Sequence, residues 1–404
     1  MVLGTVTEHD EKSPQRVVVI GSTGSIGTQV LDVLGQFPQY FKVAGLAAGH
    51  NHTLLAQQVQ RFKPDQVAIA TPQALEQLAL AFTRPAWTKA YTGEQGLLDL
   101  LTETEADVVV IGLVGIAGLA PTIQALTHGK TVLTANKETF VTGGHLVQPY
   151  LRQVITLDSE HSAILQCLKG ESERSVSRLL LTASGGPFRG YTHEQLRQVS
   201  LADALRHPTW QMGQKITVDC ATLMNKGLEM IEAHWLFGVD YDRIQVVVHP
   251  QSLVHSGVAF VDGSVLFQAG VADMRCPIRY GLSLTLPAVG GLNASGLRLP
   301  EPAASAQLDL FTMPALTFEA PNLERFPCLA LAAEAGRRGP AITTVLNAAD
   351  EVAVADFIAG KIGFADIPRQ IERALNRVAS FGTSAPTLAE VLEIDLETRM
   401  SLAV

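Results

Sequence analysis

The 404-residue sequence predicts an α/β fold of three parts, and three patterns along the chain support this prediction. Between residues 16 and 157, short β-branched runs alternate with amphipathic stretches, which is typical of a parallel sheet covered by helices on both faces. After residue 158 strands with tight turns occur among helices, which indicates an α+β domain. From residue 321 onward the apolar spacing is helical, which predicts a C-terminal α-helical domain.

The N-terminal domain is predicted to span residues 15–157, after a loose tail at residues 1–14. Its expected helices include "TLLAQQVQRF", "PQALEQLALAF" and "PTIQALTHGK". The last of these ends at Gly129, because glycine is favoured just past a helix. The expected strands lie at residues 17–20, 43–47, 66–69, 107–111, 131–134 and 154–157.

The central domain is predicted at residues 158–295. Within "VVVHPQSLVHSGVAFVDGSVLFQAG", the pair Asp262-Gly263 predicts a hairpin turn in which both central residues take positive φ. Residues 296–320 are predicted to form a connector, because proline and alanine are frequent there and periodic apolar positions are few. In the helical domain at 321–404, helical spacing occurs in "LALAAEAGRRG", "TVLNAADEVAVADFIAG" and "IPRQIERALNRVASF".

The composition argues against several classes of protein. A net charge of −9 argues against a nucleic-acid partner, which requires a basic surface. The four cysteines form no C-x-x-C pair, so no disulfide framework or zinc site is expected and a cytoplasmic location fits best. The uncharged run at residues 108–126 contains glycines and a proline. It is therefore predicted to be a buried strand, a glycine loop and a helix rather than a membrane span.

The stretch "VVVIGSTGSIGTQVLDVL" at residues 17–34 reads as a strand, a glycine-rich turn and the start of a helix. Gly21 permits a sharp exit from the strand, Gly24 allows a ligand to approach, and Gly27 lets the helix pack closely. Backbone N–H groups at such a turn suit a phosphate, which favours a dinucleotide site. A tight connection without a ligand is the alternative. Hydroxyl donors are expected from Ser22, Thr23 and Ser25.

The end of the second strand indicates which dinucleotide is bound. An NAD site usually has an acid there that holds the ribose 2′-hydroxyl, but this chain has "VAGLAAGHNHT" without a carboxylate. Gly49, His50, Asn51 and Thr53 offer only donors and neutral groups, which suit a 2′-phosphate. The sequence therefore predicts NADPH, with an ordinary polar loop as the alternative. Partial charge on His50 would make NADPH affinity fall as pH rises.

An acidic cluster follows the last predicted strand of the first domain, in "VITLDSEHSAIL". Asp158, Ser159, Glu160 and His161 begin a helix there, and acids or serine at this position can simply cap the helix. A third acid, Glu229, lies in "MNKGLEMIEAHWLFG". Three carboxylates together would suit Mg²⁺ or Mn²⁺ better than zinc. On the pattern alone, capping and metal binding both stay open.

Eight motifs occur in an order that resembles the 1-deoxy-D-xylulose 5-phosphate reductoisomerases. They are "GSTGSIG", "ANKE", "LDSEHSAI", "TASGGPF", "HPTWQMG", "VDCATLMNKGLE", "HPQSLVHS" and "LNAADEVAV". Several motifs together are more specific than any one, and the resemblance covers roughly residues 15 to 400. It implies a Rossmann-like NADPH-binding domain, a central catalytic and dimerisation domain, and a C-terminal helical domain.

The resemblance also implies a reaction and its cofactors. 1-Deoxy-D-xylulose 5-phosphate would be rearranged and then reduced by NADPH to 2-C-methyl-D-erythritol 4-phosphate, in non-mevalonate isoprenoid precursor biosynthesis. A divalent ion, Mn²⁺, Mg²⁺ or Co²⁺, would assist. The implied partners are a small sugar phosphate and a second copy of the chain in a homodimer, with no nucleic acid and no membrane.

The same resemblance implies roles for individual residues. The implied metal ligands are Asp158, Glu160 and Glu229. Catalysis is assigned to these three acids with Lys137 and His207. The implied substrate contacts are Lys137, Ser159, Glu160, Ser184, His207, Trp210, Cys220, Asn225, Lys226 and Glu229. The implied cofactor contacts are Gly21, Thr23, Gly24, Ser25, Ile26, Gly49, His50, Asn51, Asn136, Glu138 and Gly213.

Some of these residues have ordinary alternatives, and two depart from the family. Lys137 and Glu138 alone would be predicted as a surface ion pair, and Ser184 as a turn residue. By resemblance Trp210 and Met212 belong to a lid that excludes water, with core packing as the alternative. His161 is expected to support the metal ligands, and His249 and His255 either to pack in the core or to lie just behind those ligands. Cys220 stands where the family usually has serine, and His50 where some relatives have lysine or arginine.

Two other functions remain open on the residues alone. An aldehyde or homoserine-type dehydrogenase would share the glycine turn but would not need three carboxylates and a separate phosphate site. An NADPH-binding regulatory protein would use the acids only as helix caps. Metal-dependent turnover would separate both from the reductoisomerase.

Overall fold

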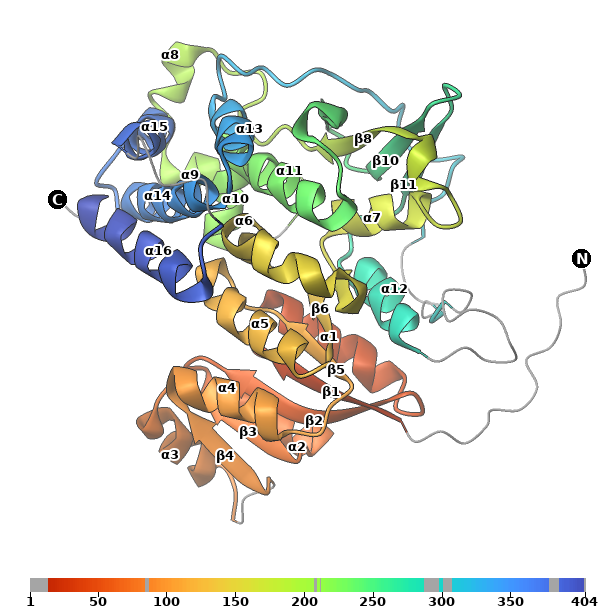
Figure 1. The fold of residues 1–404 in the computed structure, drawn as a ribbon, viewed down its shortest axis with the longest axis vertical. Coiled ribbons are helices and arrows are strands. Elements are labelled where there is room, and N and C mark those ends of the chain that lie inside the picture. Colours follow the sequence, from red (N-terminus) through yellow and green to blue (C-terminus); the bar gives the residue numbers. More distant parts are fainter. Residues whose placement is uncertain are drawn as a thin grey trace, which may run out of the picture.

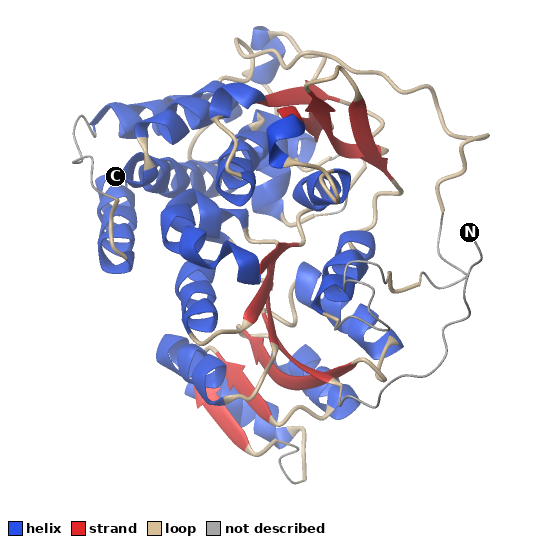
Figure 2. Cartoon of the chain, turned by 45° about the vertical axis from the view of Figure 1, so that its right-hand side comes forward, coloured by secondary structure: helices blue, strands red, loops and turns tan. Residues whose placement is uncertain are grey.

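The computed structural model describes residues 14–83, 87–206, 209–210, 212–286, 298–300, 307–377 and 385–402. It confirms the predicted fold class. Figure 1 shows a parallel sheet with its helices at the bottom of the view, and a second sheet and the C-terminal helices at the top. Figure 2 shows the same two sheets as separate groups of strands with helices around them.

The first sheet has seven strands in the order β4-β3-β2-β1-β5-β6-β7, and all neighbouring strands are parallel. The strand order reverses between β1 and β5, and ligands bind at such reversal points in open α/β sheets. The strands are β1 Gln15–Ile20, β2 Phe41–Ala48, β3 Gln66–Ile69, β4 Lys89–Thr92, β5 Val108–Ile111, β6 Thr131–Thr134 and β7 Val154–Thr156. The helices that accompany this sheet are α1 Ser25–Gln36, α2 His52–Phe62, α3 Pro72–Leu80, α4 Gly93–Glu103, η1 Gly115–Gly118, α5 Leu119–Thr127, α6 Lys137–Val147 and η2 Gln148–Gln153.

All six predicted strands of this sheet are present, but β4 was not predicted. Its sequence, "KAYT", has one buried large side chain, Tyr91, and lies at the edge of the sheet. The Tyr91 hydroxyl donates a hydrogen bond of 2.8 Å to Gln66 Oε1 on β3. The strand therefore depends on its pairing with β3, which a four-residue pattern does not reveal.

The central strand is buried on both faces, as expected for a parallel sheet. Val17 and Val19 of β1 belong to one apolar cluster, and Val18 and Ile20 belong to another on the opposite face. Helix α12, at Arg275–Thr285, packs against α1, and its Ile278 shares the cluster of Val17. Although α12 lies within the predicted central domain, it covers the N-terminal sheet.

The second sheet has the order β11-β10-β8-β9, in which β8 and β9 are parallel and the other pairs antiparallel. The predicted hairpin joins β10 to β11. Gly263 has φ 88°, but Asp262 does not have positive φ, so that part of the prediction is wrong. Asp262 Oδ1 instead accepts a hydrogen bond from Ser264 N at 2.9 Å, which a longer turn with one left-handed residue allows. The elements of this part, besides α12, are α7 Ser159–Cys167, η3 Glu173–Ser175, β8 Val176–Ala183, α8 His193–Leu196, α9 Leu201–Ala204, α10 Gln214–Thr222, α11 Met224–Phe237, η4 Tyr241–Arg243, β9 Ile244–Val248, β10 Val254–Phe260 and β11 Val265–Ala269.

The C-terminal part is helical, as predicted. One apolar cluster contains Leu181 of the second sheet together with Val345 and Ile371 of these helices, so the two parts share a core. Within the described part of the connector, the one bridge to a strand pairs Glu319 with Val248. The C-terminal elements are α13 Cys328–Arg338, α14 Pro340–Ile358, η6 Phe364–Asp366, α15 Ile367–Arg377 and α16 Leu388–Leu402.

The uncharged run at residues 108–126 forms β5, η1 and most of α5, as predicted. Across the described residues, no helix combines the length and the apolar composition that crossing a membrane requires. The four cysteines all lie among the described residues, and no disulfide joins any of them.

Candidate active site

The glycine turn between β1 and α1 has the geometry that its sequence predicts at two positions. Gly21 has φ 74°, and a Cβ there would lie 2.7 Å from the Gly112 backbone oxygen. A Cβ on Gly27 would lie 2.2 Å from the Gly21 oxygen, so glycine is required for α1 to approach the turn. No side chain caps α1 at Gly24, which leaves its first backbone N–H groups for a ligand.

Two polar side chains that were expected near the dinucleotide form hydrogen bonds with other residues of the chain. Ser22 is buried and its hydroxyl donates to Gln58 Oε1 at 2.8 Å, so the expectation that Ser22 supplies a donor to a ligand is wrong. At the end of β2, Asn51 Oδ1 caps α2 by accepting from Leu54 N at 3.0 Å. His50 beside it is exposed.

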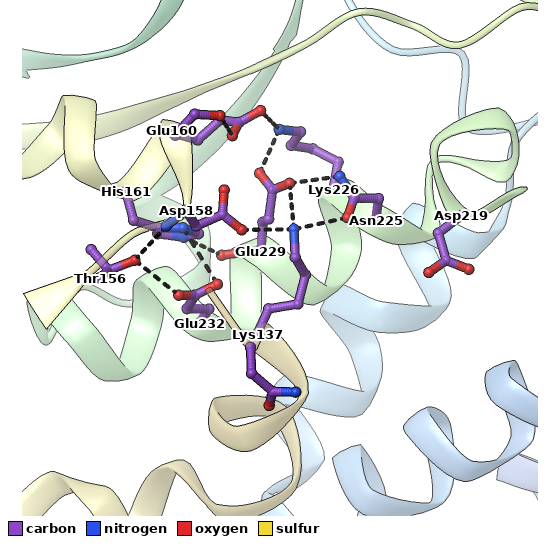
Figure 3. Close-up of polar contacts among 12 residues, drawn as sticks. Lys137, Thr156, Asp158, Glu160, His161, Asp219, Asn225, Lys226, Glu229 and Glu232 are labelled. Atoms are coloured by element: carbon purple, nitrogen blue, oxygen red, sulfur yellow. Dashed lines mark hydrogen bonds and ion pairs between the residues drawn. The ribbon is translucent and has the colours of Figure 1, made fainter. Parts of the chain in front are cut away.

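The three predicted metal ligands lie together. Asp158, Glu160 and Glu229 can each offer one carboxylate oxygen, and these oxygens all lie within 4.8 Å of one another. Asp158 is at the N-cap position of α7, but its side chain accepts no capping hydrogen bond. Capping therefore does not explain Asp158. Figure 3 shows its carboxylate directed toward Glu229 and Lys137.

Two buried lysines contact these acids. Lys137 Nζ lies 2.7 Å from Asp158 Oδ2 and 3.0 Å from Glu229 Oε1, and it donates to Asn225 Oδ1 at 2.9 Å. Lys226 Nζ lies 2.8 Å from Glu160 Oε1 and also contacts Glu229 Oε2. Because Lys137 and Lys226 are 7% and 3% exposed, these are not surface ion pairs.

Burial and charge oppose each other in this cluster. Burial raises the pKa of Asp158 to about 6, although Lys137 partly offsets this effect. Burial also acts against ionised Glu160, but the charges of Lys226 and Lys137 and the hydrogen bonds to Glu160 together outweigh it and hold the pKa of Glu160 well below its ordinary value. The carboxylates around Lys137 outweigh its desolvation and raise the pKa of its ammonium group. Glu160 and Glu229 likewise outweigh the desolvation of Lys226 and raise its pKa, so both lysines remain cationic.

His161 and a fourth acid, Glu232, lie next to the three carboxylates. His161 Nε2 contacts the Glu229 backbone oxygen at 2.9 Å, and its Nδ1 lies 3.4 Å from Glu232 Oε2. Burial lowers the pKa of His161 to about 4, so the ring is neutral near pH 7. Sequence reasoning did not identify Glu232. Its spacing of three residues from Glu229 places both on one face of α11 and was the available signal.

The predicted substrate-phosphate residues surround the junction of α10 and α11. Gly185 and Gly186 both have positive φ, and a Cβ on Gly186 would lie 2.7 Å from the Cys220 oxygen. These glycines therefore let the loop that carries Ser184 approach Cys220. Leu223, with φ 62°, links α10 directly to α11. Three of the predicted site residues follow this corner on α11, namely Asn225, Lys226 and Glu229.

A cavity of about 900 Å³ joins the glycine turn to the acid cluster. The predicted residues that line it are Gly24, Ser25, Ile26, Lys137, Glu138, Asp158, Ser159, Glu160, Ser184, Trp210, Gly213, Cys220, Asn225, Lys226 and Glu229. The predicted residues not among its lining are Gly21, Thr23, Gly49, His50, Asn51 and Asn136. The amide of Asn136 binds protein groups, because it donates to Leu113 O and Gly115 O and accepts from Thr139 N. His207 lies outside the described residues.

Several lining residues were not predicted. His255, which was predicted to pack in the core or to lie just behind the metal ligands, lines the same cavity as these ligands, with its ring centroid 6.1 Å from that of Trp210. Lys215 and Asp219 of α10 also line it. Their spacing of four residues places them on one helix face, but only the fold shows that this face meets the cavity. Met212, a predicted lid residue, lines it as well.

The donor set fits a hard divalent cation. Three carboxylates supply oxygen ligands only, which suits Mg²⁺ or Mn²⁺ and not a structural zinc site. The parallel sheet supplies a phosphate-binding turn at its order reversal, and the same cavity reaches both features. The fold and the site together define a dinucleotide-dependent oxidoreductase with a divalent-cation site.

Comparisons with known proteins give the particular family. The family model described as 1-deoxy-D-xylulose 5-phosphate reductoisomerase matches residues 17–144, and models of C-terminal domains of the same enzyme match residues 154–237 and 269–401. A 1-deoxy-D-xylulose 5-phosphate reductoisomerase from Acaryochloris marina is 48% identical over 394 residues, which are 96% of this chain and 94% of the relative. One from a Synechococcus species is also 48% identical, over 96% of this chain and 97% of the relative. The chain therefore belongs to the 1-deoxy-D-xylulose 5-phosphate reductoisomerase family.

Solved structures of this family have the same fold. The Zymomonas mobilis enzyme in complex with NADPH is 37% identical with a TM-score of 0.86, covering 97% of this chain and 98% of that one. A DOX-P reductoisomerase in complex with NADPH, fosmidomycin and magnesium is 34% identical with a TM-score of 0.87, covering 96% and 97%.

Proposed function

We propose that this chain converts 1-deoxy-D-xylulose 5-phosphate to 2-C-methyl-D-erythritol 4-phosphate, by a rearrangement followed by reduction with NADPH. The reaction belongs to non-mevalonate isoprenoid precursor biosynthesis and depends on a divalent metal. The observation that carries this proposal is the single cavity shared by the glycine turn and the three acids, in a chain that belongs to the reductoisomerase family. Two steps that need a metal and a hydride donor can then occur in one cavity.

The glycine turn is proposed to hold the dinucleotide through backbone N–H groups at α1, with Ser25 and Ile26 beside it. Glu138 and Gly213 line the cavity farther along the chain and are proposed to contact the cofactor. Asn136 is proposed to shape the cofactor site indirectly. Its amide donates to Leu113 O and Gly115 O and so holds the loop after β5 in place. Gly21, Thr23, Gly49, His50 and Asn51 remain proposed cofactor contacts by family resemblance.

Asp158, Glu160 and Glu229 are proposed to hold the divalent ion. When bound, such an ion supplies Lewis-acid chemistry, because it polarises a carbonyl and stabilises negative charge on oxygen. Lys137 would add a positive charge beside the substrate oxygens that face the ion. Its Nζ donates to Asn225 Oδ1 at 2.9 Å, and this hydrogen bond orients the ammonium group. Ser159 donates to Glu160 Oε2 at 2.6 Å and so faces the same volume.

Ser184, Cys220, Asn225 and Lys226 are proposed to receive the substrate's phosphate, with His207. Gly185 and Gly186 both have positive φ, and the Gly186 N–H donates to Ser184 Oγ at 3.2 Å, which orients this side chain. Trp210 and Met212 are proposed to exclude water above the site. An aldehyde dehydrogenase would have no use for this second, anion-binding region.

The direct test is NADPH oxidation by the purified chain, measured with 1-deoxy-D-xylulose 5-phosphate in the presence and absence of Mn²⁺ or Mg²⁺. We expect turnover only with substrate and metal together, and its loss on chelation. Metal-independent turnover would favour an ordinary dehydrogenase, and no turnover with intact NADPH binding would favour a regulatory protein.

The assembly is proposed to be a homodimer in a reducing cytoplasm. β11 is an edge strand whose Val265, Leu266 and Phe267 are 43%, 44% and 47% exposed, which suits burial against a second copy. Light scattering should give twice the chain mass, and Phe267→Asp should shift it to the monomer. A wild-type monomer would contradict the dimer. We also propose three domains, at residues 15–157, 158–295 and 321–404. This division agrees with a monomer as well as with a homodimer.

A further inference from the structure

A second ionic cluster lies beside the cavity, and the roles proposed above do not explain it. Lys215 Nζ lies 2.8 Å from Asp219 Oδ2, 3.0 Å from Asp350 Oδ2 and 3.4 Å from Glu138 Oε1. These four residues are termed the Lys215 cluster. Figure 3 shows Asp219 well apart from the acids that surround Lys137, so the two clusters are separate.

The Lys215 cluster joins three elements that are distant in sequence. Glu138 belongs to α6, Lys215 and Asp219 to α10, and Asp350 to α14 of the C-terminal helices. Glu138 directly follows Lys137, so consecutive residues of α6 serve the two clusters. α10 begins directly after Gly213, which lines the cavity at the N-cap position. One ammonium group therefore ties the cavity wall to the C-terminal helices.

The cluster has three carboxylates for one cation, and all are shielded from water. The side chain of Lys215 is 19% exposed, that of Asp219 2% and that of Asp350 0%. Burial raises the pKa of Asp219, with the charge of Asp350 adding to the effect, and burial also raises the pKa of Asp350. With one proton on this aspartate pair, the three carboxyl groups keep two negative charges, and Lys215 is the ammonium group that contacts all three.

Glu138 and Lys215 both line the cavity, whereas Asp350 does not. A carboxylate can accept hydrogen bonds from the hydroxyl and amide groups of a dinucleotide, but it repels the phosphates. Glu138 therefore suits the nicotinamide or sugar end of the cofactor. The glycine turn, which lacks acids, suits the phosphates.

We propose that Lys215 is a positioning residue for NADPH, which holds the Glu138 carboxylate at the cavity wall and anchors α10 on α14. The inference rests on the proposed function, because it assigns Glu138 to the cofactor. Without Lys215, three buried carboxylates would lose their common cation, and Glu138 would turn away or accept a proton. In either case a hydrogen-bond acceptor for the cofactor is lost or displaced.

The test is NADPH binding to the full-length chain, measured by fluorescence titration without substrate, together with kcat and KM for each substrate. Lys215→Met should raise the Kd for NADPH by about tenfold or more, while Lys215→Arg stays within about threefold of the wild type. The matched control is Lys130→Met, because Lys130 is also buried, donates to Thr104 O at 2.6 Å and is absent from the cavity lining. That variant should lose thermal stability but keep the wild-type Kd for NADPH.

A folded Lys215→Met protein with wild-type NADPH affinity would overturn the inference, because a purely structural lysine changes melting temperature alone. If Lys215→Met does not fold, Lys215→Met/Asp350→Asn replaces it, since removing one carboxylate with the ammonium leaves fewer buried charges unpaired. The same two outcomes then decide. Absence of turnover by the wild type would contradict the proposed function, and unchanged binding by the variant would contradict only the role of Lys215.

Discussion

At the scale of single residues, the site holds buried carboxylates that contact buried lysines. Glu229 is 1% exposed and contacts both Lys137 and Lys226, while Asn225 Nδ2 donates to its Oε1 at 2.7 Å. Removing one member of such a set leaves the others buried and unpaired, which is costlier than losing a surface ion pair. Replacing any one of these residues should therefore disturb the others.

Cys220 is the residue at which the predicted phosphate site departs from its family. Burial raises the pKa of the Cys220 thiol well above its ordinary range, so the group is a neutral and weak donor. Cys220→Ser should lower KM for 1-deoxy-D-xylulose 5-phosphate by up to about threefold or leave it unchanged. Cys167→Ser, at a buried cysteine outside the cavity lining, is the control and should leave KM as it is. A many-fold rise in KM for Cys220→Ser would contradict a phosphate contact that a hydroxyl can make.

His50 follows β2 and is exposed, in a loop without carboxylates. His50→Asp should reduce the ratio of kcat/KM for NADPH over NADH by about tenfold or more, because a carboxylate holds a 2′-hydroxyl and repels a 2′-phosphate. His50→Asn introduces no charge and serves as the control. Equal kcat/KM values of the wild type with the two cofactors would refute the NADPH preference.

The element that the sequence specifies most strictly is the turn from β1 to α1. A Cβ on Gly27 would meet the Gly21 oxygen at 2.2 Å and Ser22 Cα at 2.6 Å, and neither backbone atom can move without shifting the turn. Gly27→Ala should lower the free energy of unfolding by about 2 kcal/mol and weaken NADPH binding. Gly190→Ala is the control, because a Cβ there meets nothing within 4 Å. Urea unfolding and NADPH titration measure both effects, and a Gly27→Ala protein with wild-type values would show that α1 does not pack as described.

Asp350 on α14 gives a prediction about pH. Because burial raises its pKa in the folded protein, the folded state binds this proton more tightly than the unfolded state does. The stabilising contribution of the protonated form is complete below the ordinary aspartate pKa and is lost as pH rises above it. The stability of Asp350→Asn relative to the wild type should therefore increase as pH rises from the ordinary aspartate pKa to the raised pKa of Asp350 in the folded protein. Asp242→Asn, at a side chain that is 83% exposed, should show no such trend, and a matching trend would remove burial as the cause.

The elements that sequence reasoning identified were those with a strong local signal. Residues 66–69 and 131–134 match their strands at both ends, because β-branched residues and flanking turn residues are adjacent in the chain. β4 was missed because its stability comes from β3. The positive φ expected at Asp262 was wrong, because the observed turn needs only Gly263 to be left-handed.

Across the whole molecule, sequence reasoning located Asp158, Glu160 and Glu229, and the fold brings them within 4.8 Å of one another. It could not show that Lys215 and Asp219 line the cavity, because nothing in their neighbouring residues indicates a cavity built from three parts of the chain. The predicted central domain includes α12, and this helix packs both against α1 of the first sheet and against α7. Long-range packing decides such features, and local patterns do not encode it.

The proposed metal site and the proposed NADPH site share one cavity, and a single measurement tests this most directly. Anomalous diffraction from a crystal grown with Mn²⁺ and NADPH should show one ion between Asp158, Glu160 and Glu229, with the nicotinamide in the same cavity of about 900 Å³. An ion bound elsewhere, or no ion between these carboxylates at saturating Mn²⁺, would contradict it.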